Sequence, residues 1–197
     1  MAKHSPKNQV YSKPPKGGFV YEPEEVFPGD YQEHENYREA LRELKDPAML
    51  RSKKYQEQQW RAIRIGANPQ LLLHMRLMVA RFKQVGIPVF PSEIVRSHER
   101  QNQLKADGFS KASGAKAPHP YGCAYDLVHS VRGWNLSKKQ WEVFGHVGKE
   151  LAIQRNIPMI WGGDWKFYDP AHWQLKEWRQ IMTDYPWPPA NKGIAHR

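Results

Sequence analysis

The amphipathic pattern over residues 68–86 constrains the fold of this chain more than any other sequence feature. Asn68 is a good N-cap residue, Pro69 suits the first helical position, and Gly86 follows the last periodic apolar residue. Apolar side chains recur at alternating steps of four and three: Leu71, Met75, Met78, Phe82 and Val85, with Leu72 and Val79 beside them. Such spacing places them on one face of a helix. The pattern predicts a helix that is well buried.

A strand and a short helix are predicted next. Residues 87–95 have the apolar character of a strand, and Pro88 and Pro91 favour the edge of a sheet because proline donates no backbone hydrogen bond. Ser97 caps a short predicted helix that ends at Gly108. A loop rich in Gly, Ser, Ala and Lys follows.

The later part of the chain contains another amphipathic helix and two short strands. Ser137 and Gln140 have capping-box spacing at the start of this helix. Its apolar stripe consists of Trp141, Phe144, Val147 and Leu151. Residues 159–161 are predicted as a buried strand, 162–163 as a turn and 172–175 as a further strand. This order of elements indicates an α+β domain in which helices flank a small antiparallel sheet.

The two ends of the chain differ in composition from this middle part. Residues 1–30 contain several prolines and glycines among scattered Lys and Glu, which is typical of an extended arm. Weak helical patterns follow over 31–45 and 49–65, and neither predicts an independent core. We therefore expect an N-terminal arm with weak helices (1–66), a central domain (67–180) and a Trp/Pro-rich tail (181–197).

The charge of the chain indicates the partners that it attracts. Thirty Lys and Arg residues against twenty Asp and Glu give a formal net charge of +10. Basic proteins of this size bind polyanions such as nucleic acid, an anionic membrane or an anionic cell wall. The lysines of the arm are spread among Glu and Pro, and no nucleic-acid-binding motif is recognised. The sequence therefore argues against nucleic acid as the partner.

Cysteine content and hydropathy bear on the compartment. The chain has one cysteine, Cys123, so an intrachain disulfide is excluded. No stretch approaches the roughly 18–20 apolar residues of a membrane span, and the N-terminal residues contain no apolar segment of a secretory signal. We expect a protein that is made in the cytoplasm and has no transmembrane segment. No pattern predicts its oligomeric state.

Two separate segments contain the residue types of a zinc site. The first runs from His119 to Asp126, and the second from Asp169 to His172. The two imidazoles and the Asp126 carboxylate supply three zinc ligands and leave a fourth position open, as a catalytic zinc requires. The Asp169 carboxylate can then accept a proton from water as a general base. These residues predict a metal-dependent hydrolase.

Strand alternation indicates which side chains of the first segment face the metal. If residues 122–126 are extended, Asp126 shares a face with the small residues Gly122 and Ala124, which leave room for an ion. Cys123 then points to the other face. This parity argues against a Cys123 thiolate as a ligand.

A structural role for each histidine remains the alternative. The chain has nine histidines, and a lone histidine followed by proline, as at His119, is usually a loop residue. His98, His129 and His146 are competing candidates for a metal ligand. His146 lies beside the apolar stripe of a predicted helix, where a surface or half-buried structural role is expected.

The same residues match a known family. The chain resembles the zinc D-Ala-D-Ala peptidases of the VanX/VanY type over about residues 70–176, and it is most similar to their phage and bacterial relatives, the L-alanyl-D-glutamate endopeptidases. The family pattern is Ser-x-His-x-x-Gly-x-Ala-x-Asp, followed later by an acidic residue, two residues and His. The matching positions are His119, Gly122, Ala124, Asp126, Asp169 and His172.

The resemblance implies a hedgehog/DD-peptidase-like fold and a role for each site residue. His119, Asp126 and His172 are expected to bind Zn2+. Asp169 is expected to be the catalytic base, and Arg96 to stabilise the developing oxyanion or a substrate carboxylate. The residues expected to contact substrate are Arg96, Gln101 and Trp165. For Trp161 and Trp165 a place in the core or at the rim of the site remains the alternative.

One departure from the family pattern concerns substrate choice. Ala117 occupies the position of the family serine that shapes the substrate side of the site. In contrast, an aspartate at position 169 and the segment Trp161–Trp165 favour the endopeptidase branch, because the carboxypeptidases of the family tend to carry Glu as the base. The metal chemistry is thus better defined than the bond that is cut.

The resemblance implies a zinc metallopeptidase that hydrolyses peptidoglycan stem peptides, with an L-alanyl-D-glutamate endopeptidase as the leading hypothesis. The natural setting is a phage-type endolysin or a virion-associated lysin that acts at the anionic bacterial cell wall. Two alternatives remain. One is a D,D-carboxypeptidase that releases terminal D-Ala, and the other is a non-catalytic structural or binding protein of the same fold.

Overall fold

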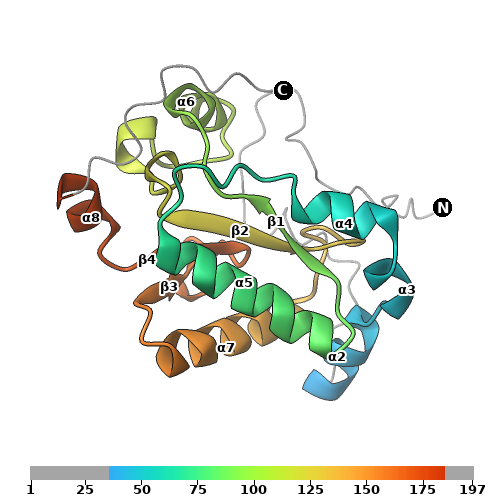
Figure 1. Ribbon diagram of the computed structural model, residues 1–197. Coiled ribbons are helices and arrows are strands. Elements are labelled where there is room, and N and C mark those ends of the chain that lie inside the picture. Colours follow the sequence, from blue (N-terminus) through green and yellow to red (C-terminus); the bar gives the residue numbers. More distant parts are fainter. Residues whose placement is uncertain (1–35, 185–197) are drawn as a thin grey trace, which may run out of the picture.

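The computed structural model describes residues 36–184, which form a four-stranded antiparallel sheet surrounded by helices (Figure 1). The strands β1 (Val89–Glu93), β2 (Ala124–His129), β3 (Met159–Trp161) and β4 (His172–Leu175) lie in the order β1-β2-β4-β3. The helices are α2 (Tyr37–Leu44), α3 (Pro47–Leu50), α4 (Lys53–Gln59), α5 (Pro69–Gln84), α6 (His98–Ala106), α7 (Lys138–Gln154) and α8 (Trp178–Asp184). Three short 3-10 helices are η1 (Gly114–Lys116), η2 (His119–Tyr121) and η3 (Gly162–Asp164). The predicted α+β class with an antiparallel sheet is confirmed.

The two central strands separate a polar face of the sheet from an apolar one. The register of β2 and β4 pairs Asp126 with His172 and Ala124 with Gln174. Directly opposed residues of antiparallel strands project to the same side, so these four side chains share one face. Tyr125 projects to the other side and is fully buried. The sheet thus holds two of the predicted ligands, Asp126 and His172, on one face and the core on the other.

Helices α5 and α7 lie side by side across the sheet (Figure 1). The rings of Phe82 and Phe144, one from each helix, have centroids 4.6 Å apart. His74 of α5 is fully buried; its Nε2 donates to the carbonyl oxygen of Gly148 (2.9 Å), and its Nδ1 accepts from the Tyr125 hydroxyl (2.7 Å). These bonds tie both helices to β2 through a buried polar side chain whose ring nitrogens are both satisfied.

Most elements predicted from the sequence are present. The helix after Asn68, the helix capped by Ser97 and the capping box at Ser137 are confirmed, as is the position of β1 at the edge of the sheet. The placement of Val85 on the buried stripe is wrong: its side chain is 44% exposed, because α5 ends one residue earlier. In the described part of the chain, no helix is long and apolar enough to cross a membrane.

The prediction of one helix over 49–65 is wrong. The segment contains the end of α3, all of α4 and a loop that leads to α5. The side chain of Asp46 caps α3 and that of Ser52 caps α4, and each cap starts a new helix because it satisfies backbone N–H groups of a first turn. The weak helix predicted over 31–45 is present as α2.

Helix α2 packs against α7 and contributes to the core. Leu44 at its end is fully buried, and its carbonyl oxygen accepts a hydrogen bond from Nε2 of His129 at 2.9 Å. The division of the chain at residues 66 and 180 stays a prediction. The expected arm over 1–30 lies outside the described residues, as does the part of the expected tail from residue 185 onward.

Candidate metal centre

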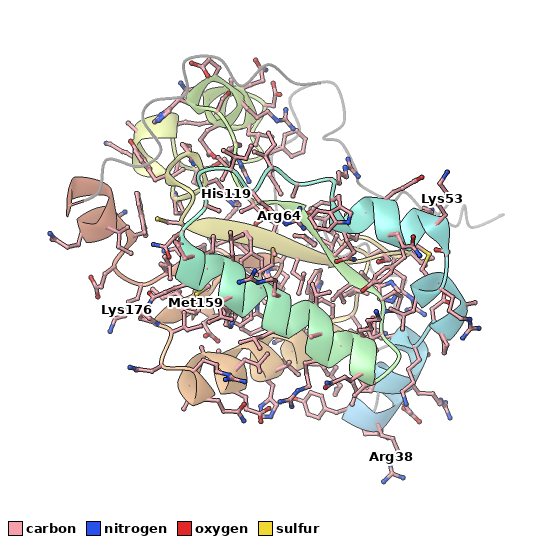
Figure 2. All side chains as sticks on the ribbon, in the orientation of Figure 1. Arg38, Lys53, Arg64, His119, Met159 and Lys176 are labelled. Carbon is pink, nitrogen blue, oxygen red and sulfur yellow. The ribbon has the colours of Figure 1, made fainter. Side chains whose placement is uncertain are left out.

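His119 lies in a tight turn immediately before β2, where Figure 2 labels it. The turn ends at Gly122, whose φ of +64° lies in the left-handed region that glycine adopts without strain. A Cβ atom at this position would collide with the carbonyl oxygen of Gly66, so the loop before α5 packs directly on the turn. The run expected to be extended from residue 122 therefore begins as a strand only at Ala124.

Three ligand-type atoms from three segments converge beside β2. Oδ1 of Asp126 lies 3.3 Å from Nε2 of His119 and 3.1 Å from Nδ1 of His172, and the two nitrogens are 3.3 Å apart. A tetrahedral zinc ion with ligand distances of about 2.0–2.1 Å separates its ligand atoms by about 3.3–3.4 Å. Within residues 36–184 this is the one group of three or more His, Cys, Asp or Glu side chains with such spacing. Its donor set and spacing fit zinc.

The second nitrogen of each imidazole faces an oxygen acceptor. Nδ1 of His119 lies 2.7 Å from the carbonyl oxygen of Ile94, and Nε2 of His172 lies 3.2 Å from Oε1 of Gln174. Zinc-binding histidines usually donate their other N–H in this manner, which fixes the ring and the tautomer. The nitrogens that remain for a metal are Nε2 of His119 and Nδ1 of His172.

The charged groups of this cluster shift one another's pKa values. Burial alone would raise the pKa of Asp126, but the charges of His119 and His172 and their hydrogen bonds hold this pKa well below its usual range. Burial, aided by the Arg96 charge, lowers the pKa of His119. Burial opposes protonation of His172 too, but the hydrogen bond to Asp126 and the charges of Asp126 and Asp169 raise its pKa. The carboxylate is thus ionised and ready to bind a cation.

Asp169 lies on the turn that leads into β4. Its backbone N–H donates to the carbonyl oxygen of Gly162 (3.1 Å), and its own carbonyl oxygen accepts from the N–H of His172 (3.1 Å). Burial raises the pKa of its carboxyl to about 6, and the Asp126 charge adds to this rise, whereas the His172 and Arg96 charges oppose it. A carboxylate with this pKa is a stronger base than an exposed aspartate and is still largely ionised at neutral pH.

The Arg96 guanidinium contacts the candidate metal centre by an ion pair with Asp126. One of its terminal nitrogens, Nη2, lies 3.2 Å from Oδ2 of Asp126 and 2.9 Å from Oε2 of Glu93. The other, Nη1, donates to Oε1 of Gln101 at 3.1 Å. Gln101 is buried and donates in turn to Ser110 and to the carbonyl oxygen of Ala112. The predicted substrate-binding residues Arg96 and Gln101 thus form one network that ends on a ligand carboxylate.

The two tryptophans considered for the substrate groove occupy different places. Trp165 is half-buried, and its ring centroid lies 5.2 Å from that of His172, so it borders the centre. Trp161 is buried; its ring stacks on Trp173, and its indole N–H donates to the carbonyl oxygen of Pro170 at 2.8 Å. Trp161 therefore belongs to the core and supports the turn that carries Asp169.

The alternative ligands lie outside the triangle of donor atoms. Cys123 is buried, its Sγ contacts the carbonyl oxygen of Tyr121, and burial raises the pKa of its thiol to about 11. His98 packs edge-on against Tyr121. His129 bonds Leu44, as described above, and His146 is exposed on α7. The structure brings together the predicted site residues and leaves these four apart.

Sequence reasoning missed two residues beside the centre. Glu93 pairs with Arg96, three residues later, and such close opposite charges were visible in the sequence. Gln174 follows His172 by two residues in a predicted strand, so strand alternation alone would have placed both on one face. The acceptor at Ile94 is a backbone carbonyl, which no side-chain motif reveals.

Comparisons with known proteins agree with the resemblance seen in the sequence. The model of a D-alanyl-D-alanine carboxypeptidase family matches residues 110–175. This segment contains the three predicted ligands and Asp169, and it begins after Arg96 and Gln101. The similarity to the D-Ala-D-Ala peptidase family is therefore confirmed for the part of the chain that contains the predicted metal ligands.

Among solved structures, the L-Ala D-Glu endopeptidase ChiX of Serratia marcescens is similar to this chain. The two share 26% sequence identity, with a TM-score of 0.49 over 68% of this chain and 91% of that chain. No curated protein matches the chain.

Proposed function

We propose that the protein is a zinc peptidase that hydrolyses peptide bonds in the stem peptides of peptidoglycan. The observation that carries the proposal is the triangle of His119 Nε2, Asp126 Oδ1 and His172 Nδ1, with sides of 3.1–3.3 Å. The similarity of residues 110–175 to a family of D-alanyl-D-alanine carboxypeptidases supports the substrate class. The proposed catalytic domain spans residues 67–180.

Zinc bound by these three residues would polarise the scissile carbonyl and lower the pKa of a water molecule. Asp169 then accepts the proton of the attacking water and passes it to the leaving amine, as a general base and acid does in sequence. Its half-buried position raises its pKa to about 6, which brings it closer to the pH at which both steps proceed. Proton transfer is the only chemical role proposed for the Asp169 carboxylate.

Arg96 supplies a fixed positive charge in direct contact with Asp126, one of the three members of the ligand triangle. Its guanidinium is 8% exposed and bonds Asp126 and Glu93, so it partly neutralises two carboxylates beside the centre. We propose that this charge also stabilises negative charge that develops on the substrate carbonyl. Trp165, at the border of the centre, is the proposed apolar contact for the substrate.

We propose an endopeptidase that cuts between L-Ala and D-Glu. The aspartate at position 169 and the sequence Trp161–Trp165 support this branch of the family. The second candidate is a D,D-carboxypeptidase, which the description of the matching family model favours. Ala117, which is buried and replaces the family serine, bears on this choice because it alters the substrate side of the site.

The products of muropeptide digestion distinguish the two activities. We expect mass spectrometry of purified muropeptides treated with the zinc-loaded protein to show a glycan that retains L-Ala and a released peptide that begins with D-Glu. Release of free D-Ala alone would replace the endopeptidase by the carboxypeptidase. Unchanged muropeptides at every zinc concentration would favour a non-catalytic protein of the same fold.

The proposed place of action is the bacterial cell wall. The net charge of +10 supports attraction to an anionic wall, and we propose a phage-type lysin as the biological setting. The partner is then peptidoglycan itself, and nucleic acid is not required.

A further inference from the structure

A side-chain acceptor lies behind one of the proposed ligands. Oε1 of Gln174 is 3.2 Å from Nε2 of His172, whereas Nδ1 of the same ring points at Asp126 (3.1 Å) and at His119 (3.3 Å). The ring of His172 is therefore held between the ligand triangle on one side and an amide oxygen on the other.

A neutral imidazole carries its single N–H on one nitrogen and offers a lone pair on the other, and a metal binds the lone pair. An acceptor at Nε2 favours the tautomer with the proton on Nε2, because that N–H then has a partner. Nδ1 is left to bind the metal, and Nδ1 is the nitrogen that the triangle requires.

The register of the sheet restricts the direction in which the Gln174 side chain can point. It lies between Ala124 of β2 and Ile160 of β3 in the register of the sheet. The side chains before and after it, Trp173 and Leu175, are fully buried on the opposite face, which fixes the orientation of β4. Ala124 is small and fully buried, so the long side chain of its cross-strand partner can lie along the sheet toward His172.

His119 shows the same arrangement with a different acceptor. Its Nδ1 bonds the carbonyl oxygen of Ile94 at 2.7 Å, which leaves Nε2 for the metal. This backbone acceptor cannot be removed by substitution. Substitution of Gln174 can therefore test how the orientation of an imidazole affects zinc binding.

We propose that Gln174 is a positioning residue of the metal centre: its side-chain oxygen holds the Nε2–H of His172 so that Nδ1 faces the ion. The inference rests on the proposed zinc centre, and it is independent of which peptide bond is cut. Loss of such a partner typically weakens metal binding by about 10–100-fold.

Zinc affinity, measured on the full chain by competition with a chromophoric chelator, tests the proposal without reference to activity. Gln174→Met keeps the length of the side chain and removes the acceptor, so we expect about 10–100-fold weaker zinc binding. Gln174→Glu retains an acceptor oxygen and should bind zinc nearly as well as the original chain. Gln154→Met, at an exposed position on α7, is the matched control and should leave the affinity unchanged.

A spectroscopic measurement on the unsubstituted protein does not depend on how the variants fold. Nitrogen-15 NMR of the zinc-loaded chain should show His172 with the proton on Nε2 and the metal on Nδ1. A proton on Nδ1, or zinc affinity of Gln174→Met equal to that of the control, would overturn the role of Gln174. Failure of the unsubstituted chain to bind zinc would instead overturn the metal centre itself, so the two failures are distinguishable.

Discussion

At the scale of single residues, the surroundings of the two aspartates suit Asp126 to its proposed role as a ligand and Asp169 to its proposed role in proton transfer. The charges and hydrogen bonds of His119 and His172 overcome the effect of burial and lower the pKa of Asp126, whereas burial raises the pKa of Asp169 to about 6. The surroundings thus move the pKa values of two aspartates in opposite directions, which is consistent with the different roles proposed for them.

Replacement of Asp169 by Ala should separate metal binding from hydrolysis. The carboxylate of Asp169 is not one of the three converging ligands, so the variant should keep its zinc. Its rate of wall lysis should fall by about 10²–10⁴-fold, the usual contribution of a general base. Zinc content by elemental analysis and turbidity of a wall suspension measure the two effects. A variant that still lyses walls at the original rate would remove Asp169 from the mechanism.

At the scale of elements, the turn between β3 and β4 determines where Asp169, the proposed base, lies. The carbonyl oxygen of Gly162 accepts hydrogen bonds from the N–H groups of Asp169 and Trp165. The indole N–H of Trp161 donates to the carbonyl oxygen of Pro170, the residue after Asp169. A Cβ atom at Gly162 would collide with the carbonyl oxygen of Asp169. The turn can therefore adopt this course only with glycine at that position.

We expect Gly162→Ala to displace Asp169 and reduce hydrolysis by at least about 10²-fold, because a shift of about 1 Å at a reacting group has effects of this size. Ser137→Ala is a suitable control: it removes the capping box of α7, away from the centre, and should lower stability by about 1 kcal/mol. The control should retain its rate per folded molecule. Equal rates for Gly162→Ala and the control, measured on zinc-loaded proteins, would contradict the role of the turn.

The sequence predicted elements well where one local pattern determines them. The stripe and caps of α5 and α7, the short apolar run of β3 and the polar–apolar alternation of β4 are each local patterns. The error over 49–65 has a local cause too, since the caps at Asp46 and Ser52 were present in the sequence and were not used. The segment expected to be extended from residue 122 forms a strand only from Ala124, because Gly122 adopts a left-handed backbone conformation. The sequence pattern did not indicate this conformation.

The contacts around the site were less predictable because they join distant residues. The ion pair of Arg96 with Asp126 spans 30 positions, and the bond between His119 and Ile94 spans 25. The bond between His74 and Tyr125 spans 51 positions, and neither helical spacing nor strand alternation specifies it. The predicted ligands were identified from their residue types in two segments, from strand parity at Asp126 and from the resemblance to a family.

At the scale of the whole molecule, two buried histidines link stability to pH. His74 and His129 are each less than 3% exposed, and each has both ring nitrogens bonded in the neutral form. Burial lowers the pKa of both below the usual value for histidine. At these two positions the unfolded chain therefore binds more protons than the folded chain at mildly acidic pH.

The contribution of these two histidines to the unfolding free energy of the metal-free protein should consequently fall as the pH decreases below about 6.5, the pKa of histidine in an unfolded chain. The loss continues until the pH reaches the lowered folded-state pKa values. Urea unfolding at a series of pH values measures this slope. His74→Gln, which keeps a hydrogen-bonding side chain but cannot titrate, should make the slope shallower. An unchanged slope would show that His74 does not contribute to it.

The net charge of +10 predicts a salt-dependent association with the wall. Raising the ionic strength from 0.1 to 1 M shortens the screening length from about 10 Å to about 3 Å. We expect the fraction of protein that sediments with purified anionic walls to fall over this range, while cleavage of a small soluble muropeptide changes little. Sedimentation that is independent of salt would contradict attraction by charge.

If His119, Asp126 and His172 hold one zinc ion on which hydrolysis depends, zinc content and hydrolysis should be lost and restored together. The most direct test measures zinc per chain and muropeptide hydrolysis in the same samples of the original protein, the chelator-stripped protein and His119→Ala. We predict one zinc per chain with hydrolysis, loss of both on stripping with recovery when zinc is restored, and neither in the variant. Hydrolysis by the stripped protein, or full zinc binding by His119→Ala, would contradict the account.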